Sequence, residues 1–324
     1  MQTTAILIMA TMVTTSFTSC KEDDPVVPPV TNTITDVVIA NANFSTLKDA
    51  VVKAGLDGTL KGTGPFTVFA PDNAAFTATG FGYPANFVAA TPAATLSTVL
   101  LYHTIPARIL SNAVPAGPNA RVVTANGDSV FVTRDTRGVF VNGMQVAQAD
   151  ITADNGVIHR MARALIYPSG SIVATAQSAT GVLDSLVKAV VRVNNTPLAN
   201  GGDPNLISTL NSNIITVFAP NNAAFTALLQ VLGTNNIDNI PVAQLNAVLK
   251  YHVRLGRAFS SDIVNTSSFA MLQGGNTTLN LSNGTNNGPT ITGNGNGGNR
   301  SNIALTNIMT RNGVVHVIDR VLLP

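Results

Sequence analysis

Charge, aromatic rings and cysteine are all scarce in this chain of 324 residues. Charged side chains make up 10% of the residues, aromatic ones 5%, tryptophan is absent and cysteine occurs once. A lone cysteine excludes an internal disulfide, and so few ionisable groups leave little material for an active site. The basic residues form no block and do not alternate with aromatic ones. We therefore expect no nucleic acid partner.

Apolar residues, at 45% of the chain, are plentiful, and the length is about twice the roughly 150 residues of a typical domain. The chain contains an internal duplication: residues 67–76 return almost unchanged as residues 216–225. The spacing between later equivalent motifs then widens, which predicts insertions in the second copy within residues 194–206 and near residues 282–302. Both tracts are rich in Asn, Gly, Ser or Thr, so we expect surface loops.

Each copy mixes helices and strands without regular alternation. Helical spacing of apolar residues occurs at residues 47–54, 96–100, 183–190 and 245–249. Short apolar runs, typical of buried strands that stop at a proline, occupy residues 66–69 and 214–218, and each is followed by side chains that can cap a helix. A hairpin is predicted at residues 129–141, and closing strands at residues 157–166 and 314–323. The pattern favours an α+β fold over a parallel doubly wound sheet.

Three sequence blocks occur in the same order in both copies. The first contains Phe69, Pro71 and Phe76 in one copy and Phe218, Pro220 and Phe225 in the other; the second is Tyr-His at residues 102–103 and 251–252; the third ends at His159 and His316. The blocks resemble those of fasciclin (FAS1) domains, over about residues 33–324. The resemblance implies two tandem FAS1 domains, 33–168 and 169–324, each a β-sandwich or wedge flanked by helices. Because the linker near residues 167–171 is short, we expect the domains to touch.

The four histidines occupy equivalent positions in the two copies: His103, His159, His252 and His316. Imidazole is the commonest metal ligand, but the spacing places each histidine on the apolar side of its helix or strand. We therefore expect buried, neutral histidines that hydrogen-bond within the core, with no metal and no cofactor.

The resemblance also implies a binding role for the Tyr-His motif, which is associated with adhesion in the family. The candidate binding residues are therefore Tyr102, His103, Tyr251 and His252. Because we expect the histidines to be buried, Tyr102 and Tyr251, which lie off the apolar stripe, are the better candidates for direct contact. The two inserted tracts are the other candidates, since their polar side chains suit glycan hydroxyls; the alternative is a solvated loop without a partner.

The N-terminal segment resembles an export signal. Residues 1–20 carry no charge, and the apolar stretch is too short for a confident membrane span but suits a signal peptide. It ends in residues 17–20, which resemble a lipobox, with Cys20 as the lipidation site; Phe17 in place of the usual Leu, and the lack of a preceding Lys or Arg, depart from that pattern. Residues 21–32 form an acidic and proline-rich tether. The alternative is an ordinary signal peptide with an incidental cysteine.

The chain offers little for catalysis, because it has no Gly-x-Ser-x-Gly motif and its acidic residues do not recur in matching blocks. We expect a non-enzymatic adhesion lipoprotein, exported across the inner membrane, held on the outer membrane and facing the cell exterior. Its expected partner is an extracellular matrix protein or polysaccharide. The alternatives are a structural protein of the envelope or biofilm that self-associates, and a glycan-binding accessory lipoprotein.

Replacing Cys20 by alanine tests the anchor. We expect the Cys20→Ala protein to leave the membrane fraction, because the sulfur that accepts the lipid is lost. Fractionation followed by immunoblotting measures the shift, and an unchanged distribution would contradict the lipobox.

Overall fold

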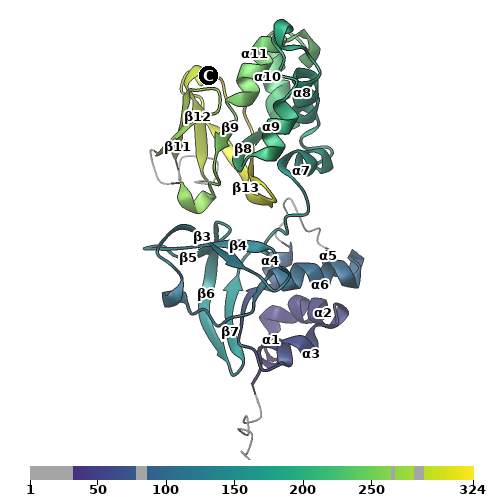
Figure 1. Cartoon of the computed structure of the whole chain (residues 1–324), viewed down its shortest axis with the longest axis vertical. Coiled ribbons are helices and arrows are strands. Elements are labelled where there is room, and N and C mark those ends of the chain that lie inside the picture. Colours follow the sequence, from purple (N-terminus) through teal and green to yellow (C-terminus); the bar gives the residue numbers. More distant parts are fainter. Residues whose placement is uncertain (1–31, 78–85, 264–266, 281–287) are drawn as a thin grey trace, which may run out of the picture.

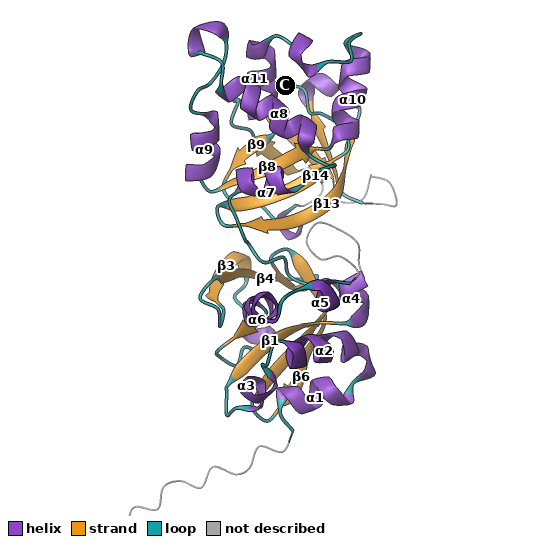
Figure 2. Ribbon diagram, turned by 90° about the vertical axis from the view of Figure 1, so that its right-hand side faces the viewer, coloured by secondary structure: helices purple, strands orange, loops and turns teal. Residues whose placement is uncertain are grey.

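The structure, a computed structural model, describes residues 32–77, 86–263, 267–280 and 288–324 (Figure 1). The expected signal peptide, Cys20 and nearly all of the tether lie outside the described residues. Two similar halves lie end to end, and in each the helices gather beside one part of a sheet (Figures 1 and 2). No described helix combines the length and apolarity that a membrane span requires.

The first half runs from residue 34 to residue 161. Its elements are α1 (Ile34–Ala40), η1 (Ala42–Phe44), α2 (Ser45–Lys53), α3 (Asp57–Lys61), β1 (Phe66–Pro71), α4 (Asn73–Thr77), α5 (Phe87–Ala90), α6 (Ala93–Tyr102), β2 (Thr104–Ile105), η2 (Ser111–Ala113), β3 (Gly117–Val123), β4 (Ser129–Asp135), β5 (Gly138–Val141), β6 (Met144–Ala153) and β7 (Gly156–Met161).

The second half runs from residue 172 to residue 318. Its elements are α7 (Ile172–Ser178), α8 (Asp184–Asn194), η3 (Leu198–Asn200), α9 (Leu206–Ser212), β8 (Ile215–Pro220), α10 (Asn222–Val231), η4 (Ile237–Asn239), α11 (Val242–Lys250), β9 (Val253–Leu255), η5 (Ser260–Asp262), β10 (Ser267–Ala270), β11 (Asn276–Asn280), β12 (Thr290–Gly293), η7 (Asn294–Asn296), β13 (Ser301–Thr310) and β14 (Gly313–Ile318).

The two sheets share one topology. Their strand orders are β2-β1-β7-β6-β5-β4-β3 and β9-β8-β14-β13-β12-β11-β10. One pair in each is parallel, β1 with β7 and β8 with β14, and the other neighbours are antiparallel. A single parallel pair in an otherwise antiparallel sheet confirms the α+β prediction. The predicted hairpin is β4 with β5.

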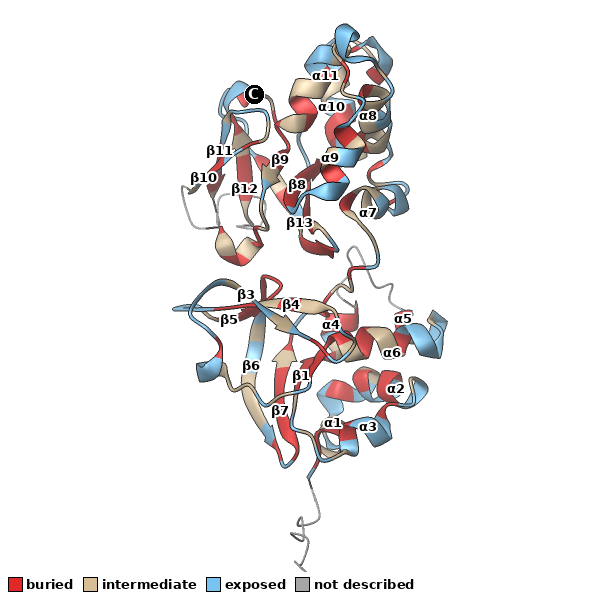
Figure 3. Ribbon diagram, viewed as in Figure 1, coloured by how far each residue is buried: buried red, intermediate tan, exposed pale blue. Residues whose placement is uncertain are grey.

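The central strands are buried on both faces, which explains their unbroken apolar sequence (Figure 3). Because side chains alternate along a strand, β1 directs Val68 and Ala70 into the core under the helices and Phe69 into the core between the strands. In β8, Val217 and Phe218 divide in the same way. In each half, therefore, one strand contributes side chains to two apolar clusters.

The helices that follow these strands begin as the sequence predicts. Asp72 accepts a hydrogen bond from the backbone N–H of Ala75 at 2.9 Å, and Asn221 accepts one from Ala224 at 2.8 Å. Each side chain satisfies a donor that the first helical turn leaves unpaired.

Two predictions need correction. The closing strands end at Met161 and Ile318, because backbone N–H groups farther on turn away from the ladder and bond instead to histidine rings. The second inserted tract is also only partly loop: residues 281–287 lie outside the described part, but Thr290 and Ile291 are buried in β12, paired with β11. The first tract does connect α8 to α9, as predicted.

The prediction that the two halves touch is confirmed. Asn119 donates a hydrogen bond to the carboxylate of Asp262 at 2.7 Å, and Ser260 donates one to the carbonyl of Gly143 at 3.3 Å. The ring of Phe259, fully buried, lies 6.0 Å from that of Phe131, centroid to centroid. Element η5 of the second half is thus seated against the strand turns of the first.

Gly143 offers a direct test of this interface. A Cβ added there would lie 2.5 Å from the Cβ of Phe259, so Gly143→Ala should force the halves apart. Gly55→Ala is the matched control, because Gly55 has a similar φ of +69°, against +73°, but no neighbour within 4 Å. In solution scattering of residues 32–324, the wild type and Gly55→Ala should fit one fixed arrangement, and Gly143→Ala a more extended, variable one. Identical scattering from the two variants would contradict the interface.

Candidate functional site

The Tyr-His motif stands where a helix ends and an edge strand begins. In the first half Tyr102 is the last residue of α6, and His103 caps the helix before β2. In the second half Tyr251 caps α11, and His252 precedes β9. The two side chains of each pair follow one another directly, and in the first half their rings meet edge to face, with an interplanar angle of 88°.

Each histidine of the motif joins its helix to the C-terminal end of its own half. The Nδ1 of His103 bonds the carbonyl of Val99 at 2.8 Å, and its Nε2 accepts from the backbone N–H of Leu165 at 2.8 Å. The equivalent contacts of His252 are to Val248 at 2.7 Å and Leu322 at 2.9 Å. Because a carbonyl only accepts and an amide only donates, both rings must be neutral with the proton on Nδ1.

Each tyrosine joins the same helix to the outer strands. The hydroxyl of Tyr102 donates to the carbonyl of Ser129 at 3.2 Å and accepts from the side-chain amide of Asn142 at 2.9 Å. The hydroxyl of Tyr251 donates to the carbonyl of Asn276 and accepts from the N–H of Asn294 at 3.1 Å. The motif therefore connects three separate parts of each half at one point.

The expected exposure of the tyrosines is wrong. Tyr102 and Tyr251 are both 0% exposed, and the adjacent histidines are buried as predicted, at 3% and 2%. The apolar stripe seen in the sequence covers only one side of a helix. The end of α6 also lies beneath the sheet, so the other side of the helix is buried there too. In the folded protein these four side chains cannot contact a partner directly.

His159 and His316 form a second pair of buried links. Each Nε2 donates to a carbonyl, that of Ile109 or that of Ala258, at 2.9 Å in both cases. Each Nδ1 accepts from a backbone N–H of the neighbouring strand, at 3.2 Å from Asp150 and at 3.4 Å from Asn307. Their rings stack on Phe69 and Phe218, with centroids 5.7 and 5.4 Å apart. The remaining motif residues are buried as well: Pro71, Phe76, Pro220 and Phe225.

A comparison with known protein families agrees with this duplicated arrangement. The fasciclin domain model matches residues 42–168 and 199–324. The chain belongs to the fasciclin domain family. The resemblance predicted from the three sequence blocks is thereby confirmed, and we refer to the two halves as FAS1 domain 1 and FAS1 domain 2.

Relatives of this FAS1 pair occur in bacteria and animals. Protein sll1483 of Synechocystis is 37% identical over 137 residues, which cover 42% of this chain and 74% of that protein. Transforming growth factor-beta-induced protein ig-h3 of Sus scrofa is 35% identical over 146 residues, 45% of this chain but only 21% of the relative's length. A solved FAS1 domain pair from the insect cell adhesion molecule fasciclin I is 17% identical, with a TM-score of 0.41, and the match covers 90% of this chain and 96% of that one.

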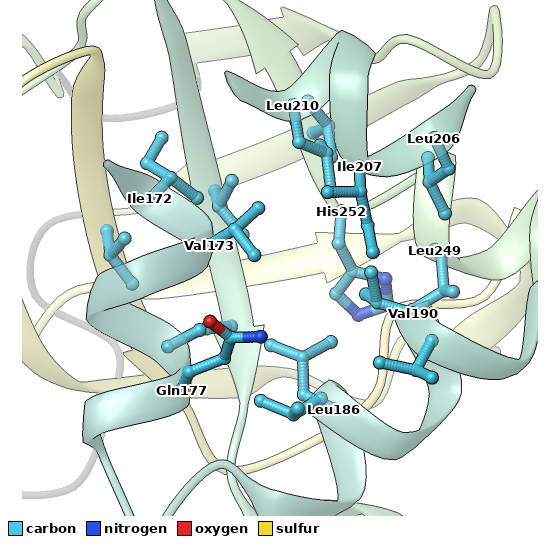
Figure 4. A pocket seen from close by; sticks show the side chains of 17 residues that line it. Ile172, Val173, Gln177, Leu186, Val190, Leu206, Ile207, Leu210, Leu249 and His252 are labelled. Carbon is cyan, nitrogen blue, oxygen red and sulfur yellow. The ribbon is translucent and has the colours of Figure 1, made fainter. Parts of the chain in front are cut away.

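FAS1 domain 2 also contains an apolar pocket that the sequence analysis missed (Figure 4). It lies between α7, α8, α9 and β8, and His252 reaches its wall. Its volume is about 50 Å³, well below the roughly 300 Å³ at which ligand pockets begin. The signal available in the sequence was the pair of apolar residues Val187 and Val190 on α8. Both line this pocket and are only half-buried in the structure.

Acid groups and imidazoles do not gather into a metal site in the part of either domain that the structure describes. Within residues 32–77, 86–263, 267–280 and 288–324, no group of three or more His, Cys, Asp or Glu side chains lies close enough to hold an ion. The histidines are instead separate, each satisfied by backbone groups.

Burial of the imidazoles makes the stability of both FAS1 domains depend on pH. Burial lowers the pKa of His103, His252 and His316 from 6.5 to about 4, although a backbone hydrogen bond opposes the shift in each case. Burial also lowers the pKa of His159. Between these limits the unfolded chain takes up protons that the folded chain does not, so folding stability must fall as the pH drops from 6.5 toward 4.

Urea unfolding of residues 32–324 from pH 7.5 to pH 4.5 tests this linkage. The three histidines with a pKa of about 4 (His103, His252 and His316) should together lower the free energy of unfolding by roughly 4 kcal/mol for each pH unit below pH 6. The aspartates with a lowered pKa act mainly below about pH 5, so the slope is read between pH 6 and pH 5. His252→Gln, which stays neutral, should be less stable at pH 7 yet show about two thirds of the slope. Stability that stays flat down to pH 5 would contradict the buried neutral rings.

Proposed function

We propose that this FAS1 pair is a surface-anchored adhesion protein that binds an extracellular matrix protein or polysaccharide without catalysis. The observation that carries the proposal is membership, twice over, of a family whose members include cell-adhesion proteins. The export signal, the lipobox-like residues 17–20 and the tether support a place on the cell exterior, anchored to the outer membrane.

The order of the two domains relative to the N-terminal anchor suits this role. The described chain starts at the outer end of FAS1 domain 1, and FAS1 domain 2 lies at the opposite end (Figure 1). An anchor at Cys20 would therefore present domain 2 to the surroundings. Many copies on one membrane would turn weak individual contacts into firm attachment through avidity.

The histidines and tyrosines shared by the two domains give no support to chemistry on a substrate. Each buried imidazole is bonded to backbone groups on both ring nitrogens, which leaves no lone pair for a general base. The binding surface must then lie outside the buried tyrosines and histidines of these motifs.

Self-association in the envelope is the second candidate function. It is favoured by large apolar side chains on the surface of FAS1 domain 2, among them Leu198, 75% exposed, and Val231, 85% exposed. Such side chains are common singly on soluble proteins, so adhesion to another polymer remains the first proposal.

Density-dependent binding distinguishes the two functions. Residues 32–324 are fixed to beads through the N-terminus at increasing density, and the beads are applied to arrays of matrix proteins and polysaccharides. The beads should bind one class of polymer on the arrays, and the number of beads retained should rise steeply with the density of protein on the bead. Beads carrying the chain fixed through its C-terminus are the control and should bind less, because domain 2 then faces the bead. If the beads bind nothing on the arrays and the protein sediments in a concentration-dependent way, the result would contradict adhesion and favour self-association.

A further inference from the structure

A cleft of about 560 Å³ lies where the two FAS1 domains meet. This volume falls within the roughly 300–1,000 Å³ of ligand pockets, unlike the small apolar pocket of domain 2. Both domains contribute polar side chains to its wall: Arg121, Asp128 and Ser129 from domain 1, and Arg257, Thr310 and Arg311 from domain 2. The cleft exists only while the domains stay together.

The charges around this cleft are unbalanced. Three arginines face it against a single carboxylate, that of Asp128, which already accepts a hydrogen bond from the hydroxyl of Tyr167. Arg121 is exposed, and its Nε donates to the hydroxyl of Ser129 at 2.8 Å. In a chain with 10% charged residues, three guanidinium groups at one place form a concentrated positive site.

Arg257 is held in place before any ligand arrives. Its guanidinium lies 4.5 Å from the centroid of the Phe131 ring, across the domain boundary, and its Nη2 donates to the carbonyl of Arg311 at 3.1 Å. Partial burial of this cation, next to Arg121, is costly unless an anion compensates it. A fixed guanidinium binds an oxyanion with little loss of side-chain entropy.

Two buried hydrogen-bonding groups of the cleft wall lack a partner within the described chain. Among the described residues, neither the Nε of Arg257 nor the hydroxyl of Thr310 has a hydrogen-bond partner, although both atoms are buried. Thr310 is 0% exposed and belongs to the wall of the cleft. Because neither atom is exposed, they add polarity behind the cleft wall but do not bond a ligand in the cleft directly.

We propose that this interdomain cleft binds carboxylate groups of an acidic polysaccharide. The planar fork of a guanidinium matches a carboxylate, and the arginines from both domains can engage successive sugars of one chain. The choice of a polysaccharide rests on the proposed adhesion function; the oxyanion site itself rests on the three arginines that line the cleft. Because the arginines come from both domains, Gly143→Ala should weaken binding as well.

Calorimetry of residues 32–324 with an oligogalacturonate tests the cleft, and its methyl ester serves as the uncharged counterpart. Arg311→Gln and Arg121→Gln should each weaken oligogalacturonate binding about tenfold or more, and added salt should weaken it further. Arg300→Gln is the matched control: Arg300 is also exposed, but it lies just before the opposite end of β13, about 30 Å from Arg311, and should change the affinity less than twofold. Thermal unfolding verifies that each variant is folded.

Several results would overturn the inference: no binding of oligogalacturonate, equal binding of the methyl ester, or equal losses from Arg300→Gln and Arg311→Gln. Inorganic sulfate or phosphate bound as tightly as the oligogalacturonate would overturn the assignment to a polysaccharide. The bead assay separates this inference from the proposed function. If the beads attach to a matrix and Arg311→Gln attaches equally well, the cleft inference fails and adhesion stands. If calorimetry shows arginine-dependent binding and the beads never attach, adhesion fails and the oxyanion site stands.

Discussion

Each FAS1 domain depends on one neutral imidazole at the end of a helix. His103 and His252 accept a backbone N–H from the chain that leaves the sheet and donate to a carbonyl of the helix. These segments are far apart in sequence, and without the ring both would leave polar backbone groups unpaired in the core. The interaction also fixes the protonation state, since a protonated ring cannot accept. Closure of the domain, its one tautomer and its sensitivity to acid are therefore consequences of the same two hydrogen bonds.

The buried motif residues that recur in both copies hold this internal framework together. Another example is the asparagine before each closing strand: Asn155 accepts from the N–H of Ile34 and donates to the carbonyl of Leu60, and Asn312 bonds Ile172 and Leu210 in the same way. Such side chains specify the fold, because each joins strands to helices that could otherwise pack in other registers. Recognition then falls to residues outside this buried framework.

At the junction of the domains, the two copies contribute different side chains. Phe259 of domain 2 packs on Phe131 of domain 1. This contact keeps Arg257 over the same aromatic ring and so builds a positive cleft from two domains that each contribute only part of it. Duplication supplied the framework, and docking of the copies supplied the asymmetry.

The sequence by itself determined the duplication, the α+β class, the helix starts at Asp72 and Asn221, and the burial of all four histidines. Each of these depends on local spacing, which the chain carries wherever it folds. It could not determine the burial of Tyr102 and Tyr251, because the second covering layer at a helix end comes from strands distant in sequence. Strand β12 was also hidden, since its polar residues become strand only through pairing with β11. The cleft was decided by tertiary structure alone, because it brings together Arg121, Arg257 and Arg311, whose separation along the chain contains no sign of their proximity.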